Sequence, residues 1–149
     1  MRIRRGADKS AGFTLIEVMC AMAVAGVLSS VAYPTYQNVV QKTRRADAQV
    51  ALLQIQMTQE RYRADHEAYG SLAEIGAAAA SPGGHYTLTV ATPTESGFEV
   101  HAAAAGVQGA DALCRHMKLV VDGLNTVYAS GSDTSFANAG PANRQCWSL

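Results

Sequence analysis

An apolar segment near the N-terminus, Ala11 to Tyr33, constrains this chain more than any other feature. From Phe13 to Tyr33 it has 21 residues, enough for a helix to cross about 30 Å of hydrocarbon. Glu17 interrupts the apolar character, and a charge at the centre of such a helix costs about 2.5–3.5 kcal/mol on insertion scales. Ionisable residues in this setting usually have a function. The segment therefore predicts a membrane helix whose glutamate needs a positively charged partner.

Charge is distributed unevenly along the chain. The first 12 residues contain Arg2, Arg4, Arg5 and Lys9 against Asp8 alone, which leaves eight Lys and Arg (12 − 4) against eleven Asp and Glu (12 − 1) in the remainder. The basic flank predicts that residues 1–12 stay cytoplasmic and that the rest faces outward. The mildly acidic remainder argues against bulk electrostatic binding of nucleic acid, although it leaves room for a local basic patch.

The boundary at Gly12 differs from an ordinary signal-peptide site, which follows the apolar run and has an A-x-A pattern. If the chain is cut after Gly12, Phe13 gains an amino group with a reference pKa near 7.7–8.0. No other basic residue lies between Phe13 and Val40. The new terminus, of this chain or of a neighbouring copy, is then the partner of Glu17, which makes Glu17 an assembly contact. The alternative is a glutamate that extends towards the lipid headgroups.

The stretch "GFTLIEVM", Gly12 to Met19, resembles the class III signal of type IV prepilins and of the related type II secretion pseudopilins. The resemblance implies that a prepilin peptidase cuts after Gly12 and methylates Phe13. It also implies that Glu17 helps to dock the subunit into a growing filament. Residues 1–12 would be a cleaved leader, and residues 13–34 would anchor the subunit in the inner membrane.

Later stretches are similar to PilE-like minor pilins of type IVa pili: "AYPTYQNVVQKTRRADAQVALL", "GADALCRHMKLVVDGLNTVYASG" and the final Cys146-Trp147. The segment from Glu67 to Val107 suggests no relative. The similarity implies a structural pilus subunit in twitching motility, adhesion or DNA uptake. Its partners would be other pilin subunits and the inner-membrane assembly machinery, and it would become extracellular after assembly. The alternatives are a competence pilin that binds DNA and a type II secretion pseudopilin.

Two helical regions are expected in succession. Gly26, Ser29, Ser30 and Pro34 weaken helix, so we expect a kink or a melted turn between Gly26 and Pro34, a region that loses helix in filaments of the resembled family. Residues 35–65 form an amphipathic pattern that we expect to bury against a sheet. Its apolar positions are Val39, Ala46, Val50, Leu53 and Met57, widened by Leu52, Ile55 and Tyr62; the charged residues, among them Arg45 and Asp47, lie largely outside this stripe.

Four alternating stretches then predict short strands: "HYTLTVAT", "GFEVHAAA", "CRHMKLVV" and "LNTVYAS". Asp122-Gly123 between the last two is a hairpin signal. The predicted fold class is α+β, the type IV pilin fold, with one long N-terminal helix packed on an antiparallel sheet of about four strands. Residues 35–149 form the globular domain. The tail after Ser130 lacks periodicity, and Trp147 is expected to cover the sheet edge.

Cys114 and Cys146 lie in the polar half of the chain, and their context favours a disulfide in an oxidising compartment, with two free thiols as the alternative. Cys20, in the apolar segment, is expected to be an inert buried thiol. Asp111, Asp122 and Asp133 have the character of turn residues. The four histidines are scattered and no catalytic motif occurs, so we expect no metal site, no cofactor and no enzymatic activity.

Overall fold

The computed structural model describes residues 12–148. The predicted leader therefore lies, except for Gly12, outside the described residues. The elements are helix α1 (Leu15–Asp65), strands β1 (Tyr86–Ala91) and β2 (Gly97–Ala104), the 3-10 helix η1 (Gly106–Ala110), strands β3 (His116–Asp122) and β4 (Asn125–Gly131), and helix α2 (Gly140–Trp147). The chain divides into two units, up to Asn38 and from Val39 onward, which are described separately below.

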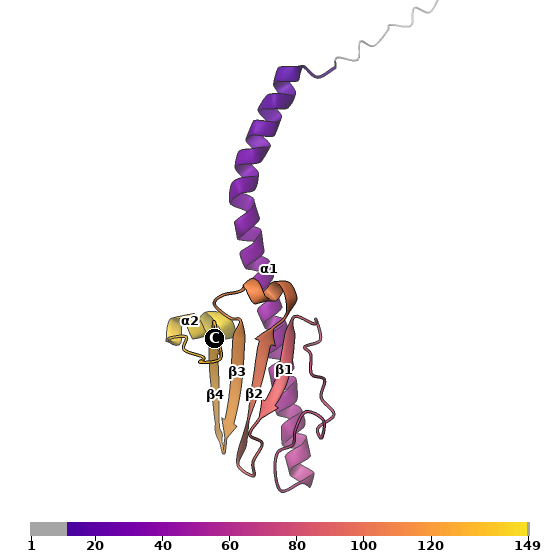
Figure 1. The fold of residues 1–149 in the computed structure, drawn as a ribbon, viewed down its shortest axis with the longest axis vertical. Helices are drawn as coiled ribbons and strands as arrows, with labels where there is room; N and C mark the ends of the chain where they lie inside the picture. The colour runs from indigo at the N-terminus through magenta and orange to yellow at the C-terminus, as the bar shows by residue number, and fades with distance from the viewer. Residues whose placement is uncertain (1–11, 149) are drawn as a thin grey trace, which may run out of the picture. The chain divides into compact units, whose positions relative to one another are not determined.

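The four strands form one antiparallel sheet in the order β1-β2-β3-β4, as predicted (Figure 1). Each strand pairs with the next one along the chain, so the connections are short. Gly123, with φ +57°, turns the chain between β3 and β4, a conformation that glycine adopts without strain. The α+β fold class is confirmed.

The core lies between this sheet and the second half of α1. The alternating apolar residues of β2 and β3 are all buried: Phe98, Val100, Ala102, Met117, Leu119 and Val121. From β1, Tyr86 and Leu88 are buried too. Alternation with period two therefore identified the correct face of every one of these three strands.

The predicted stripe on α1 was largely wrong. The buried residues of the helix are Ala48, Ala51, Leu52, Ile55 and Gln59. Val39, Val50, Leu53 and Met57 are instead 43–59% exposed. The face that meets the sheet carries two alanines together with Leu52 and Ile55. Val39, Val50, Leu53 and Met57 remain on the outward face.

Helix α1 runs without interruption through Gly26 and Pro34, so of the two expected alternatives the melted turn is not present, and a kink stays a prediction. Proline removes one backbone donor, but this part of the helix is exposed and the freed carbonyl of Ser30 remains open to other donors. Nearby hydroxyls also bond locally: Ser30 Oγ donates to the Val27 carbonyl at 2.7 Å. A loss of helix in the assembled filament stays a prediction.

The tail, which lacks periodicity, contains a helix that the sequence did not predict. Helix α2 begins with Pro141 in its first turn, where a missing N–H costs nothing, and it is only eight residues long. An element of two turns gives too few apolar repeats for a periodicity argument. The disulfide and the packing of Trp147 hold it in place, as described below.

Candidate assembly and binding sites

The N-terminal unit begins with a capped helix that contains Glu17. Thr14 precedes the first helical residue, and the backbone N–H of Glu17 donates to Thr14 Oγ1 at 3.3 Å. Thr14 and Glu17 thus occupy the N-cap and N3 positions of a capping-box pattern. Glu17 lies in the first turn, where the helix dipole favours a negative charge.

Phe13 and Glu17 also line one open groove, together with Val18, Ala21, Met22 and Ala25, of about 540 Å³. Apart from one carboxylate its lining is apolar. The surrounding helix is long and apolar enough to cross a membrane, with a mean hydropathy of 2.0 over its best window and none of that window buried. Cys20 is free and exposed on the same helix. The groove can accept an apolar side chain and one positive charge from another molecule.

In the globular unit, Cys114 and Cys146 form a disulfide with a Cα–Cα distance of 5.6 Å. It joins the segment before β3 to α2. Trp147 is 6% exposed, stacks at a tilt on Tyr128 and donates from Nε1 to the Ala129 carbonyl at 3.1 Å. The tail therefore covers strand β4 at the edge of the sheet, as the sequence predicted for Trp147.

A buried ion pair connects α1 to the loop before β3. Arg45 donates from Nε and Nη2 to the two carboxylate oxygens of Asp111, at 2.6 and 2.9 Å. Gln108 Nε2 and the Cys114 N–H also donate to Asp111, which is 2% exposed. The stripe predicted from the sequence left Arg45 outside the buried face, which was wrong. Asp111 follows η1 and accepts from the N–H of Cys114, in keeping with the turn character expected for it, but its burial and its pairing with Arg45 were not predicted. The one local signal is the spacing of Asp111 and Cys114, which suits a side-chain bond to a backbone N–H three residues on.

Tyr86 completes this buried network. Its hydroxyl donates to the Cys114 carbonyl at 3.3 Å and accepts from Gln108 Nε2 at 3.2 Å. Burial raises the pKa of Tyr86 to about 12, although the bond from Gln108 acts in the opposite direction. The tyrosine therefore stays neutral and serves as a structural donor.

Asp47, on α1, fastens the connection that leads into β1. It accepts from Ser81 Oγ at 2.5 Å, from the Gly83 N–H at 2.8 Å and from the His85 N–H at 3.4 Å. Partial burial raises the pKa of Asp47, but these three bonds outweigh burial and lower it overall. Gln59 holds the other end of the connection by bonding both the N–H and the carbonyl of Gly70. The connection is thus anchored, which the sequence did not predict.

The outer face of the sheet carries a cluster of polar side chains. Glu99 pairs with His101 and, at 3.2 Å, with Lys118. Burial opposes ionisation of Glu99, yet hydrogen bonds from His101 and Lys118 lower its pKa overall. Phe136 lies across the cluster, with Lys118 Nζ 4.6 Å from its ring centre. Arg115, next to the disulfide, donates to the Gly109 carbonyl at 2.9 Å.

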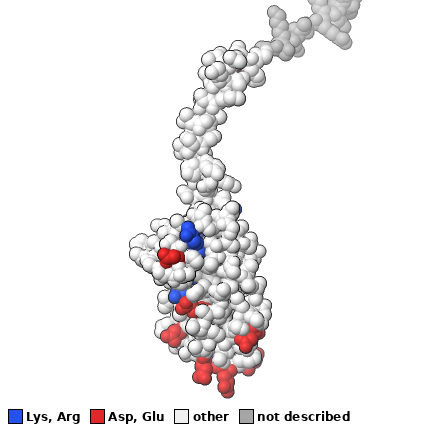
Figure 2. Space-filling model, viewed as in Figure 1, with Lys and Arg blue, Asp and Glu red and all other residues white. Residues whose placement is uncertain are grey.

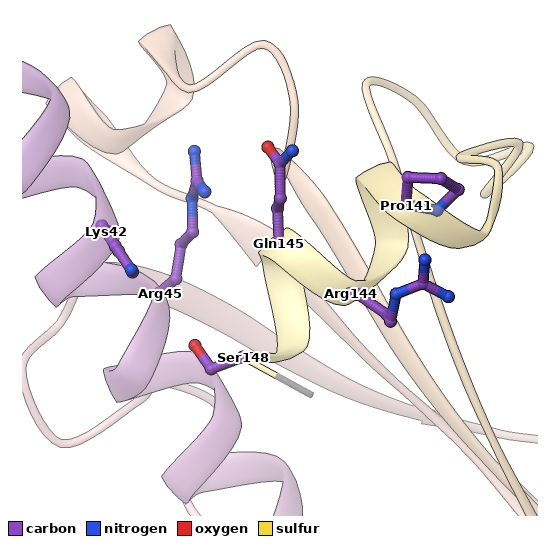
Figure 3. Close-up of a pocket in the computed structure, with 6 residues that line it drawn as sticks. All are labelled: Lys42, Arg45, Pro141, Arg144, Gln145 and Ser148. Atoms are coloured by element: carbon purple, nitrogen blue, oxygen red, sulfur yellow. The ribbon is translucent and has the colours of Figure 1, made fainter.

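A basic pocket of about 590 Å³ lies between α1 and α2 (Figure 3). Helix α1 contributes Lys42 and Arg45, and α2 contributes Pro141, Arg144 and Gln145, with Ser148 just beyond its end. The sequence analysis did not identify this pocket, because its residues lie about 100 positions apart.

Comparison with known proteins identifies the class of this fold. Residues 34–118 match the family described as "Type IV minor pilin ComP, DNA uptake sequence receptor". The chain belongs to this family. The pilin's residues 8–33 also match the "Prokaryotic N-terminal methylation motif". The family match includes the segment from Glu67 to Val107, for which the sequence alone had suggested no relative.

Two relatives match shorter parts of the pilin. It is 30% identical over 77 residues to the type IV major pilin protein PilA of Myxococcus xanthus (strain DK1622), which is 51% of this chain and 35% of that protein. It is 42% identical over 40 residues to prepilin peptidase-dependent protein D of Escherichia coli (strain K12), which is 27% of each chain. The alignments thus cover about a third and a quarter of these relatives. The predicted membership of the type IV prepilin superfamily is confirmed.

Proposed function

We propose that this type IV minor pilin is cut after Gly12, methylated at Phe13 and drawn into a pilus by Glu17. Before assembly it is anchored in the inner membrane, and afterwards it is part of an extracellular filament. The match to the methylation motif across residues 8–33 supports the processing step. The pilin architecture and the exposed apolar helix support the assembly step.

The observation that carries this proposal is apolar surface on α1 that the chain itself leaves uncovered. In the N-terminal unit, the large apolar side chains from Phe13 to Tyr36 are 44–83% exposed. In the globular unit, Val39, Val50, Leu53 and Met57 face away from the sheet. Burying apolar surface is worth roughly 25 cal/mol per Å², so these faces favour lipid first and other subunits afterwards.

The role of Glu17 is tested by Glu17→Val. The variant should insert into the membrane at least as well as the original chain, because the costly carboxylate is gone. It should still be cut to a chain that begins at N-methylated Phe13, because Gly12 is unchanged. We expect it to accumulate in the inner membrane and to be absent from sheared pili, measured by mass spectrometry of both fractions.

Two further variants separate charge from helix capping. Glu17→Gln keeps the size of the side chain and should fail in the same way as Glu17→Val if charge drives docking. Thr14→Ala removes the cap and costs about 1 kcal/mol of helix stability, so it should assemble with little loss. Normal recovery of Glu17→Val in filaments would show that the carboxylate is not the docking group. The alternative, in which Glu17 only extends towards the lipid headgroups, would then hold.

A second candidate function is DNA binding, which the description of the matched family favours. The surface beside the disulfide offers limited support for it. Of its three cations, Lys118 is paired with Glu99, Arg115 is bonded to backbone carbonyls and only Arg144 is exposed. Because affinity for DNA rises with each neutralised phosphate, we infer that binding by this surface is weak.

The DNA candidate is tested with the detergent-solubilised full chain and a fluorescent duplex over a range of salt concentrations. We expect weak binding at physiological salt, and a log–log salt slope of about one or two. Arg144→Gln should reduce that slope by about one, with Arg61→Gln, at the acidic end of the domain, as the control. Sub-micromolar, sequence-selective binding would instead make DNA uptake the leading function.

A further inference from the structure

The basic pocket between α1 and α2 contains positive charge that no ion pair within residues 12–148 neutralises. Arg45, at its base, is committed to Asp111. Lys42 and Arg144 are exposed, and neither takes part in any of the three ion pairs found among residues 12–148. Gln145 and Ser148 add neutral hydrogen-bonding groups to the rim. The pocket therefore suits carboxylate groups from another molecule.

The opposite end of the globular unit has the complementary charge. Three backbone or side-chain bonds gather the end of α1, the β1–β2 loop and the β3–β4 turn there: Arg63 to the Glu95 carbonyl, the Tyr69 N–H to Thr94 and the Gly123 N–H to Ser96. Six carboxylates belong to this end, against Arg61 and Arg63: Glu60, Asp65, Glu67, Glu74, Glu95 and Asp122. Figure 2 shows most of the red side chains towards this end, whereas the blue ones lie higher on the domain, each with a red side chain beside it.

We propose that the basic pocket receives the acidic end of a second copy of this pilin. The two surfaces differ, so the contact is head-to-tail, and a contact of that type extends into a filament unless its rotation closes a ring. Opposite charges also steer subunits into one orientation and disfavour like ends meeting. This contact rests on the proposed filament function, and adds to it the surface by which the globular domains recognise one another.

The lysines of this chain allow a direct test with a zero-length carbodiimide cross-linker, which joins an amine to a carboxylate in contact with it. After removal of the leader only Lys42 and Lys118 remain. Lys118 lies 3.2 Å from Glu99, so a link between these two within one chain is an internal control. Lys42 and Asp65 are 23 residues apart on one helix, roughly 35 Å, so a link from Lys42 to the acidic end joins two chains.

Sheared filaments and membranes should be cross-linked and analysed by peptide mass spectrometry. We expect the Lys42 peptide to be joined to a peptide that contains carboxylates of the acidic end. Arg144→Glu, which reverses one pocket charge and keeps the Lys42 amine, should reduce the yield of the Lys42 link several-fold, and adding Glu60→Lys/Glu67→Lys should restore a large part of it. Arg61→Glu, which adds negative charge at the acidic end itself, is the control for charge reversal as such and should not reduce the yield.

Several results would overturn the contact. One is a Lys118–Glu99 link without any link from Lys42, and another is a Lys42 link to a different protein. Charge-reversed subunits that cross-link as before would also refute the contact. Loss of cross-linking on addition of duplex DNA would refute it too, and would assign the pocket to phosphate. Filament incorporation is scored in the same fractions: its failure refutes the proposed function, whereas incorporation without the link refutes only this contact.

Discussion

At the scale of single residues, the globular domain depends on polar side chains of α1 that turn inward. Arg45 fastens the loop before β3 to the helix, and Asp47 and Gln59 fasten the two ends of the connection between α1 and β1. A charge is tolerated there because its hydrogen-bonding capacity is nearly satisfied within the fold. Their removal should therefore cost more than the removal of equally charged residues on the outward face.

Arg45→Met is the sharpest residue-scale test. It leaves Asp111 buried without its counter-charge, and breaking such a pair by removing one partner typically costs about 3–5 kcal/mol. We expect that loss in the free energy of unfolding, measured in urea by fluorescence of Trp147, the single tryptophan. Arg61→Met, which removes an exposed cation from the same helix, should change stability by less than about 0.5 kcal/mol.

The double variant Arg45→Met/Asp111→Asn separates charge from packing. Asparagine can still accept the bond from Cys114 but carries no charge, so the double variant should be more stable than Arg45→Met alone. If the single and double variants are equally stable, Arg45 does not act by compensating the buried charge of Asp111.

At the scale of elements, α2 is a helix that its own sequence hardly supports. Its eight residues are below the length at which an isolated helix is stable in water, so tertiary contacts must hold it. Those contacts are the disulfide, the bond from Trp147 to Ala129, and Asn143, which donates to the Tyr128 carbonyl and accepts from Ser130. The disulfide and the contacts with the edge strand β4 thus hold α2 in place.

Cys146→Ser should release α2 from the sheet. The expected loss is about 2–5 kcal/mol in the free energy of unfolding, the usual effect of removing a native disulfide from a small exported domain. The emission of Trp147 should shift to longer wavelength as its ring becomes exposed. Cys20→Ser, at the free thiol of the N-terminal unit, should leave both quantities unchanged. Unaltered unfolding of Cys146→Ser would mean that side-chain contacts alone secure the tail.

At the scale of the whole molecule, the fold is that of a subunit, because it leaves apolar surface that other molecules can cover. Its core occupies the space between the sheet and one face of α1, while the opposite face keeps large apolar residues exposed. Neighbouring positions on the helix therefore have different roles: one packs in the core and the next faces outward. Leu52 is fully buried in the core, and Leu53, 43% exposed, is available to another molecule.

Leu53→Glu should separate folding from assembly. Because the side chain lies on the outward face, we expect the Cys114–Cys146 disulfide and the unfolding free energy to be kept within about 0.5 kcal/mol. Incorporation into filaments should fall sharply, since the variant places a charge in an apolar contact. The measurement compares pilus and membrane fractions with those of Gln54→Glu, which adds the same charge at the next position.

Leu52→Ala is the complementary variant. It should lose about 2–5 kcal/mol of stability through a core cavity. Full incorporation of Leu53→Glu would show that the outward face of α1 is not buried in the filament.

The sequence by itself determined the long helix, the four strands, the inward faces of the first three, the cysteine pair and the pilin class. These follow from features within one element: a 21-residue apolar run, alternation with period two, and the contiguous motif from Gly12 to Met19. The processing site and the docking role of Glu17 also come from that motif, and they stay predictions.

Tertiary structure alone decided which face of α1 meets the sheet, because both faces of this half of the helix carry apolar residues and the sequence pattern does not choose between them. It also decided the partners of Arg45, Asp47 and Gln59, and it brought Lys42 and Arg144 to one pocket. Each of these contacts joins residues from different elements, in most cases far apart in the sequence. The sequence pattern of one element does not specify which atoms of another element will lie opposite it.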